Sequence, residues 1–214
     1  GYSREAVANS LRTEYLLQED KARLLAEVAG NNRPCLLTPA QAARMISVYI
    51  GIPFCPSRCS YCTFLGAVLK NRSGEMDDFL DSLKREITAL GRCIEELGLK
   101  VQSIYIGGGT PAVLSREQTD ELFGWLEKNY ISPATREITV EAGRPDMLDL
   151  PKLRFYKELG VNRVCINPQT MNDTTLQLIG RKHDRKGVVR SVEWVREAGI
   201  PELNMDVIVG LPGE

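Results

Sequence analysis

The chain has 214 residues, of which 43% are hydrophobic and 26% are charged, the balance of an ordinary globular protein. Its 27 Lys and Arg residues are offset by 28 Asp and Glu residues, and the net charge of −1 excludes the strongly basic surface of a nonspecific nucleic-acid binder. No run of about 18 apolar residues occurs, which excludes a membrane-spanning helix, and no apolar signal region follows a basic start. We therefore expect a cytoplasmic protein.

The first part of the chain, residues 1–46, is predicted to be a helical segment that precedes a larger core over residues 47–214. Apolar residues recur there at helical spacing behind Ser3, a residue type that caps helix N-termini. Thr38, followed directly by proline, is typical of the start of a further short helix. No residue of this segment suggests a chemical role.

From residue 47 onward, short apolar runs rich in β-branched residues alternate with longer amphipathic segments. This alternation predicts strand and helix in turn, and hence an α/β fold with a parallel sheet and helices outside it. Right-handed crossovers of such units build either a doubly wound sheet or a barrel. Ser115 and Gln118 fit a capping box at the start of one helix. The expected strands are 47–52, 102–107, 136–141, 162–166 and 203–210, and the expected helices lie near 75–98, 115–130, 149–159, 172–180 and 186–199.

Three of the six cysteines stand close together after the first expected strand. Cys55, Cys59 and Cys62 form a C-x3-C-x2-C pattern, and such crowding in a chain of this length favours metal binding over disulfides. Three thiolates can ligate three irons of a 4Fe–4S cluster and leave the fourth iron open to another ligand. The alternative is a structural zinc site, whose fourth ligand would be Cys35, Cys93, Cys165 or His183.

Glycines and polar residues close the expected strands that follow. The second strand ends in Gly-Gly-Gly-Thr-Pro at 107–111, and successive glycines let the backbone approach a ligand closely, although a plain tight turn is the alternative. Neither the dinucleotide-binding glycine pattern nor a P-loop lysine is present. Glu141, Gln169 and Asp206 lie at or near the ends of later strands. Because the carboxyl ends of parallel strands form the ligand-binding face, we expect these groups to converge with the cysteines.

The cysteine triad together with Gly-Gly-Gly-Thr-Pro resembles the radical S-adenosylmethionine (SAM) superfamily. The segments Ile-Pro-Phe-Cys at 52–55, Ile-Gly-Arg-Lys-His at 179–183 and Asp-Val-Ile-Val-Gly-Leu-Pro-Gly at 206–213 are similar to its oxygen-independent coproporphyrinogen III oxidase-like family. Val-Glu-Ala-Gly-Arg-Pro-Asp at 140–146 and Ile-Asn-Pro-Gln-Thr-Met at 166–171 depart from the commoner forms of that family and resemble its HemZ-type coproporphyrinogen dehydrogenase branch. The resemblance runs from about residue 47 to residue 214.

This resemblance implies an incomplete (β/α)6 partial TIM barrel with about five parallel strands, because the superfamily commonly has six such units and the chain ends in what is expected to be the loop after strand five. We therefore expect a fragment of a longer protein, truncated on its C-terminal side. The resemblance also implies a 4Fe–4S cluster ligated by Cys55, Cys59 and Cys62, with SAM bound to the free iron. The residues implied in SAM binding are Tyr49, Tyr61, Gly108, Gly109, Thr110, Glu141, Gln169, Arg181 and Asp206.

Individual roles follow from the same resemblance. The backbone carbonyls of Gly108 and Gly109 would hold the methionine amino group, and Glu141 would help to fix the methionine end. An acidic residue can accept hydrogen bonds from two ribose hydroxyls, and an arginine can fork onto a carboxylate. The sulfonium, the carboxylate and the ribose hydroxyls of SAM would accordingly be faced by Gln169, Arg181 and Asp206.

The implied activity belongs to porphyrin and haem biosynthesis. Reductive cleavage of SAM would give a 5′-deoxyadenosyl radical, which would abstract hydrogen from a propionate of coproporphyrinogen III and lead to its oxidative decarboxylation. No catalytic residue is expected beyond the cofactor ligands, and the implied partners are a tetrapyrrole substrate and an electron donor such as flavodoxin or ferredoxin. The alternatives are a haem-binding chaperone of the same family, a radical SAM enzyme with another substrate, and a zinc-stabilised domain without redox chemistry.

Overall fold

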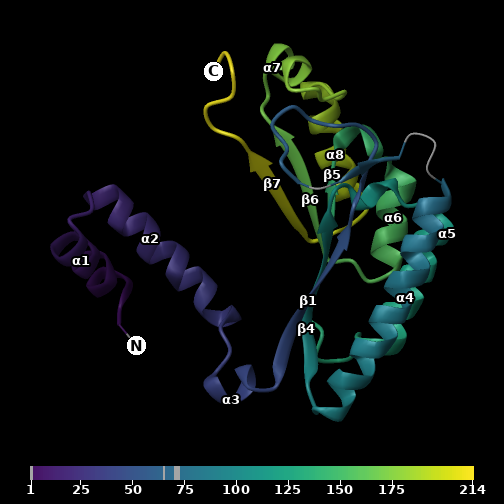
Figure 1. Ribbon diagram of the computed structural model, residues 1–214. Coiled ribbons are helices and arrows are strands. Elements are labelled where there is room, and N and C mark those ends of the chain that lie inside the picture. The colour runs from purple at the N-terminus through teal and green to yellow at the C-terminus, as the bar shows by residue number, and fades with distance from the viewer. Residues whose placement is uncertain (1, 65, 70–72) are drawn as a thin grey trace. The chain divides into compact units, whose positions relative to one another are not determined.

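Figure 1 shows the computed structural model, which describes residues 2–64, 66–69 and 73–214. The chain divides into two compact units, one ending at Ala43 and the other starting at Arg44. Among the described residues, no helix has the length and the apolar character needed to cross a membrane. Each unit is described by itself below.

The first unit consists of helices. Ser3 accepts a hydrogen bond from the Ala6 N–H at the start of the first helix, and Thr38 forms a capping box with Gln41 at the start of the last, so both expected caps are confirmed. Small side chains, chiefly Ala22 and Ala26, are buried where the first two helices pack. The elements are α1 Arg4–Tyr15, α2 Glu19–Asn32, the 3-10 helix η1 Arg33–Cys35 and α3 Pro39–Ala42.

The second unit is built on a five-stranded sheet in the order β1-β4-β5-β6-β7, and every pairing in it is parallel. The expected α/β class and the five parallel strands are confirmed. The strands are β1 Met45–Ile52, β4 Lys100–Gly108, β5 Glu137–Gly143, β6 Arg163–Gln169 and β7 Glu202–Val207. The helices are α4 Ser73–Glu96, α5 Arg116–Asn129, α6 Leu150–Glu158, α7 Asp173–Leu178 and α8 Arg185–Glu197, with 3-10 turns η2 Pro111–Val113 and η3 Pro145–Met147.

The two faces of this sheet differ in chemistry. Successive strand residues point to opposite faces, and alternate residues such as Ile104, Val140 and Val164 are fully buried in the core beneath the helices. Figure 1 shows α4, α5 and α6 running along that side of the sheet. The residues between them, including Tyr105 and Glu141, form a polar face. The fold therefore separates an apolar core from a polar surface that can serve a ligand.

A second, two-stranded sheet lies at the carboxyl end of β1. It pairs β2 Phe54–Cys55 with β3 Ala67–Val68 in parallel. The Ala67 N–H donates to the Pro53 carbonyl over 2.7 Å, and the Leu69 N–H donates to the Cys55 carbonyl over 3.0 Å. The cysteine loop is thus tied at its base to the strand that precedes it.

Every strand of the main sheet differs from the sequence-based expectation at one end or both, by at most three residues. β1 starts at Met45 rather than at 47, with a register shift between Ile46 and Ser47. β6 continues through Gln169, although strand four was expected to end at 166, and β7 ends at Val207 rather than at 210. Pairing with a neighbouring strand sets these ends, because Gln169 lies opposite Val207 after a register shift that local sequence does not reveal. The expected capping box of Ser115 and Gln118 is confirmed.

Candidate functional site

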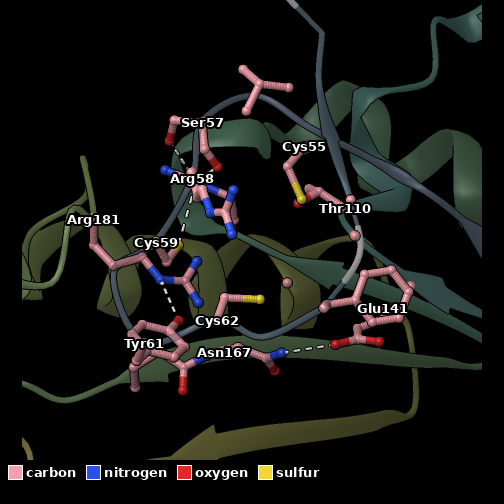
Figure 2. Close-up of a pocket in the computed structure, with 18 residues that line it drawn as sticks. Cys55, Ser57, Arg58, Cys59, Tyr61, Cys62, Thr110, Glu141, Asn167 and Arg181 are labelled. Atoms are coloured by element: carbon pink, nitrogen blue, oxygen red, sulfur yellow. Dashed lines mark hydrogen bonds between the residues drawn. The ribbon is translucent and has the colours of Figure 1, made fainter.

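One cavity lies where the cysteine loop meets the carboxyl ends of the strands (Figure 2). The cysteine triad and most of the other residues expected from the sequence line this cavity. Tyr49 and Asp206 do not line it: Tyr49 is 60% exposed and stacks on Tyr105, and Asp206 accepts a hydrogen bond from Asn204 on β7. The expected residues that line the cavity are Cys55, Cys59, Cys62, Tyr61, Gly108, Gly109, Thr110, Glu141, Gln169 and Arg181.

The three cysteines of the loop are free thiols, each partly buried. In Figure 2, the sulfur atoms of Cys55 and Cys62 point into the space between the loop and the strand ends. Burial raises the pKa of the Cys55 thiol, and a 3.6 Å hydrogen bond from the Thr110 hydroxyl offsets part of that increase. Within the described residues, no three His, Cys, Asp or Glu side chains are grouped closely enough to hold a single metal ion. All three cysteines nevertheless line the same cavity.

The glycine segment brings backbone directly against the cysteine loop. The Gly109 N–H donates to the Ile52 carbonyl over 2.8 Å, and the Thr110 N–H donates to the Phe54 carbonyl over 2.8 Å. A Cβ atom on Gly109 would lie 2.6 Å from the Phe54 carbonyl oxygen and 2.9 Å from the Cys55 sulfur, which is too close for any side chain. Glycine is required here because the backbone itself forms this wall of the cavity.

Gly108 adds a conformational reason for glycine. Its φ of 107° lies in a region that other residues rarely adopt, and an added Cβ would lie 2.9 Å from the backbone of Ile52. Strand β4 runs on through this residue, so the segment continues a paired strand instead of turning away as a plain tight turn would.

Glu141 and Asn167 form a polar pair on the wall opposite the loop. The Asn167 amide donates to Glu141 Oε1 over 3.1 Å, and the Tyr105 hydroxyl donates to Glu141 Oε2 over 3.3 Å. Burial raises the pKa of the Glu141 carboxyl, although these two hydrogen bonds oppose the increase. Asn167 Oδ1 is buried and accepts no hydrogen bond from any described residue. Since buried polar atoms are normally paired, this oxygen and Glu141 together suit a ligand that donates hydrogen bonds, such as an amine.

Arg181 and Tyr61 form a third wall. The Arg181 Nε–H donates to the Tyr61 hydroxyl over 3.1 Å, and only 8% of Arg181 is exposed. Burial raises the pKa of Tyr61 to about 12, even though the nearby guanidinium lowers it. The Ser60 N–H also donates to the Ile179 carbonyl, which joins the loop to the segment that carries Arg181. A cation therefore stands at the cavity with donors left for a carboxylate.

Sequence reasoning missed several residues that line the same cavity. Asn167 enters the sequence analysis only within the Ile-Asn-Pro-Gln-Thr-Met segment, although the alternation of β6 is a signal that could have placed it. Arg144 follows a register shift between Glu141 and Gly143, and no local pattern predicts where its side chain goes. The remaining lining residues that were not expected are Ser57, Arg58, Phe64, Gly66, Val68 and Gly143.

The side chains suggested as a fourth zinc ligand do not line this cavity. Cys93 is exposed on α4, and Cys165 is buried on β6 beside the Tyr105 hydroxyl. His183 is buried with its Nε2 atom 3.3 Å from the Pro168 carbonyl. Cys35 is exposed and belongs to the first unit.

Comparison with known proteins identifies related chains. The chain is 36% identical over 215 residues to the oxygen-independent coproporphyrinogen-III oxidase-like protein HemZ of Bacillus subtilis, covering 100% of this chain and 43% of that protein. It is 38% identical over 173 residues to the heme chaperone HemW of the same organism, covering 79% of this chain and 44% of that protein. It therefore spans less than half the length of these curated relatives.

Structure comparison and a family model agree with these relatives. Coproporphyrinogen III oxidase (HemN) from Escherichia coli superposes with a TM-score of 0.72 at 30% identity, over 82% of this chain and 41% of that chain. The model of the radical SAM superfamily matches residues 49–214. The chain therefore belongs to the radical SAM superfamily, whose members use a 4Fe–4S cluster and SAM, and within it to the group that contains HemZ, HemN and HemW.

Proposed function

We propose that this chain is the SAM-cleaving core of an oxidoreductase of porphyrin metabolism, with Cys55, Cys59 and Cys62 as the ligands of its 4Fe–4S cluster. The observation that carries the proposal is that three free thiols, a glycine wall and an unpaired buried acceptor line one cavity. When bound, the cluster and SAM supply an electron and a 5′-deoxyadenosyl radical that abstracts hydrogen from substrate. The protein supplies position, charge and exclusion of water.

The donor set supports this assignment. Three cysteines leave one iron without a protein ligand, and the other cysteines and the histidine lie outside the cavity lining. Glu141 and the unpaired Asn167 Oδ1 would accept hydrogen bonds from the methionine amino group, together with the backbone carbonyls of Gly108 and Gly109. These acceptors would orient SAM before an electron arrives, which favours cleavage over side reactions.

Arg181 would bind the methionine carboxylate. Its Nε–H is already held by Tyr61, so the other donors of the guanidinium remain for two carboxylate oxygens. Gln169, with a φ of 67°, stands at the end of β6 in a conformation rare for a residue with a side chain. We propose that this backbone conformation turns Gln169 toward the sulfonium or the ribose. We also propose that Asp206 and Tyr49 contact the outer part of SAM.

Coproporphyrinogen III is the substrate that the comparisons favour, since HemZ and HemN are similar to this chain. In this reaction a propionate side chain loses a hydrogen atom to the radical, then loses CO2 and one electron to an acceptor, and becomes a vinyl group. A flavodoxin or a ferredoxin would supply the electron that the cluster needs. The free thiols also suit a reducing compartment such as the cytoplasm.

The test is anaerobic incubation of the full, cluster-loaded protein with SAM, dithionite and coproporphyrinogen III. We expect 5′-deoxyadenosine, CO2 and the vinyl product, and we expect none of them when Cys55, Cys59 and Cys62 are all replaced by serine. Formation of 5′-deoxyadenosine without CO2 would retain the cofactor site and refute the substrate. Absence of both from a protein that carries four irons would refute the activity.

A second candidate is a haem-binding chaperone, which the 38% identity to the heme chaperone HemW favours. The same protein is titrated with haem, and binding is followed by absorbance with and without SAM. A stoichiometric complex that persists through gel filtration, combined with no turnover of coproporphyrinogen III, would favour the chaperone. Turnover without stable haem binding would favour the oxidase.

A further inference from the structure

Arg144 connects the cysteine loop to the end of β5. Its side chain is 3% exposed, and its Nη1 atom donates to the Ser57 hydroxyl over 2.8 Å and to the Ser57 carbonyl over 3.4 Å. The same Nη1 atom lies 3.9 Å from the sulfur of Cys59. A buried cation therefore contacts the loop at a cysteine and at the residue two positions before it, while the side chain belongs to the residue that follows β5.

The other side of the guanidinium is held by a carboxylate. Its Nε and Nη2 atoms donate to the two oxygens of Asp146 over 3.2 and 3.3 Å, a forked arrangement that lysine cannot reproduce. Burial would raise the pKa of Asp146, but neighbouring His183 and Arg144 lower it more. The pKa of this carboxyl therefore lies well below its ordinary value, and the group is ionised. The Nδ1 atom of His183 is 3.8 Å from Asp146 Oδ1, behind the pair. Asp146 and its surroundings thus fix the direction in which Arg144 points.

Stability alone does not account for this arrangement. A buried ion pair recovers little more than the cost of taking its charges out of water, so burying Arg144 for the sake of Asp146 would gain little. The two other arginines that line the cavity behave differently: Arg58 is exposed, and Arg181 is directed to Tyr61. Of these three arginines, Arg144 is the one that is buried with its guanidinium 3.9 Å from a sulfur of the triad.

We propose that Arg144 is a positioning residue that fixes the Ser57–Cys59 part of the loop and raises the reduction potential of the cluster through its charge at Cys59. The proposal rests on the function proposed above, because it takes Cys59 as a cluster ligand. Reduction adds one electron from an external low-potential donor to the cluster, with no bond made or broken. A fixed positive charge near a ligating sulfur stabilises the more negative, reduced form, and hydrogen bonds to the sulfurs act in the same direction.

Two substitutions of the pair separate a charge effect from a structural effect. Arg144→Gln removes a positive charge near the sulfur, so the midpoint potential should become more negative. Asp146→Asn removes the compensating negative charge, so the potential should become less negative. Disorder of the loop would not move the potential in opposite directions in the two variants. Arg144→Lys keeps the charge without the fork and should fall between Arg144→Gln and the unaltered protein.

The experiment is a dithionite titration of the reconstituted full protein, followed by electron paramagnetic resonance, with iron and sulfide content and thermal unfolding measured on each variant. Arg163→Gln is the matched control, since Arg163 pairs with Glu137 at the amino end of the sheet and its loss removes the same charge. The control should leave the potential unchanged. Loss of the cluster from Arg144→Gln, with its retention in Arg144→Lys and Arg163→Gln, supports the positioning role.

Three results would overturn the inference: an unchanged or less negative potential in Arg144→Gln, shifts of the same sign in Arg144→Gln and Asp146→Asn, or loss of the cluster from Arg144→Gln and Arg163→Gln alike. The unaltered protein distinguishes these failures from failure of the proposed function. If it binds no cluster, the function proposed above fails. If it binds a redox-active cluster and the variants behave in one of these three ways, only the role of Arg144 fails.

Discussion

The two ends of the sheet use similar residues for different purposes. At the amino end, polar side chains satisfy one another: the Asn162 amide donates to the Arg136 carbonyl over 2.7 Å while its oxygen accepts from the Ile138 N–H over 2.9 Å. At the carboxyl end, Asn167 donates to Glu141 but its buried oxygen accepts nothing from the described residues. Two asparagines of the same strand region thus stand in opposite states, one fully paired and one with an unused acceptor.

This difference separates stabilising groups from binding groups. A fully paired polar group stabilises the strand pairing around it, whereas a buried acceptor left open costs free energy until something donates to it. Arginines and cysteines of the two regions differ in position. Arg163 and Cys93 are half-exposed or exposed and lie outside the cavity lining, while Arg144 and Cys59 line the cavity. Substitution of matched pairs therefore tests whether the carboxyl end is a site.

The largest effect is expected from the cysteines. Cys62→Ser should remove a ligand from the cluster, so iron content should fall and 5′-deoxyadenosine formation should drop at least about 100-fold, beyond what loss of a supporting residue costs. Cys93→Ser changes an exposed thiol on α4 and should leave both values unaltered. Iron analysis and product quantification on the two anaerobically reconstituted proteins provide the measurement. Equal losses in both variants would mean that the cavity thiols have no special role.

The asparagines should separate stability from binding. Asn162→Ala removes two hydrogen bonds to backbone groups at the start of β5, so the free energy of unfolding should fall by about 1–3 kcal/mol. Asn167→Ala removes one hydrogen bond together with an unpaired acceptor, so stability should change by less than about 1 kcal/mol. Affinity for SAM should instead fall about 10-fold, equivalent to about 1.4 kcal/mol.

Urea unfolding of the apo proteins and equilibrium binding of SAM to the reconstituted proteins check both values. If Asn162→Ala weakens SAM binding as much as Asn167→Ala does, the proposed division between a stabilising end and a binding end of the sheet is wrong. That division is also wrong if Asn167→Ala destabilises the apo protein as strongly as Asn162→Ala.

The parts of the site that sequence predicts are those fixed by local spacing. The cysteine loop and the glycine wall are contiguous segments, so their residues could be named from the pattern, and Glu141 could be named because it ends an expected strand. The distance of a residue from the carboxyl end of its strand could not be predicted in this way. Tyr49 lies opposite Tyr105 in the pairing of β1 with β4, and the pair Gly51 and Gly107 lies two residues nearer the carboxyl ends of these strands. Tyr49 is therefore set back from the strand ends and does not line the cavity.

Irregular pairing affects two residues that line the cavity, of which Gln169 was expected from the sequence and Arg144 was not. Register shifts lie between Glu141 and Gly143 and between Ile166 and Gln169, so strand pairing is irregular directly before Arg144 and at Gln169. Such shifts arise from pairing with strands distant in sequence, and a local pattern contains no record of them. The fold class was predictable because it depends on alternation over many residues, whereas the positions of Arg144 and Gln169 depend on single irregularities of pairing.

Glutamates at the two ends should respond to substitution with opposite sign. Burial raises the pKa of Glu141, so its contribution to stability is fully present below the ordinary value of 4.5 and is lost as pH rises through the folded-state pKa. Glu141→Gln should therefore make the apo protein more stable at neutral pH, with a gain that shrinks as the buffer is acidified. Glu137→Gln loses an exposed ion pair with Arg163 and should cost at most about 1 kcal/mol at neutral pH.

Thermal unfolding across a series of buffers from about pH 4 to about pH 8 measures both variants. A loss of stability in Glu141→Gln at neutral pH, or a gain that grows on acidification, would contradict the assignment of Glu141 as a carboxylate held at a cost for ligand binding.

The smallest effect is expected from two buried threonines. Thr110 lines the cavity and donates to the Cys55 sulfur over 3.6 Å. Thr139 lies on β5 outside the cavity lining and donates to Glu137 over 2.9 Å. Thr110→Val should shift the cluster potential slightly negative, because it removes a weak hydrogen bond to a ligating sulfur but no charge. Thr139→Val should leave the potential unchanged and cost about 1 kcal/mol of stability. The same dithionite titration and urea unfolding measure the potential and the stability of both variants. Because Arg144 contributes a full charge, its loss should shift the potential more than the loss of the Thr110 hydroxyl. A shift in Thr110→Val as large as that in Arg144→Gln would show that charge does not set the potential of this cluster.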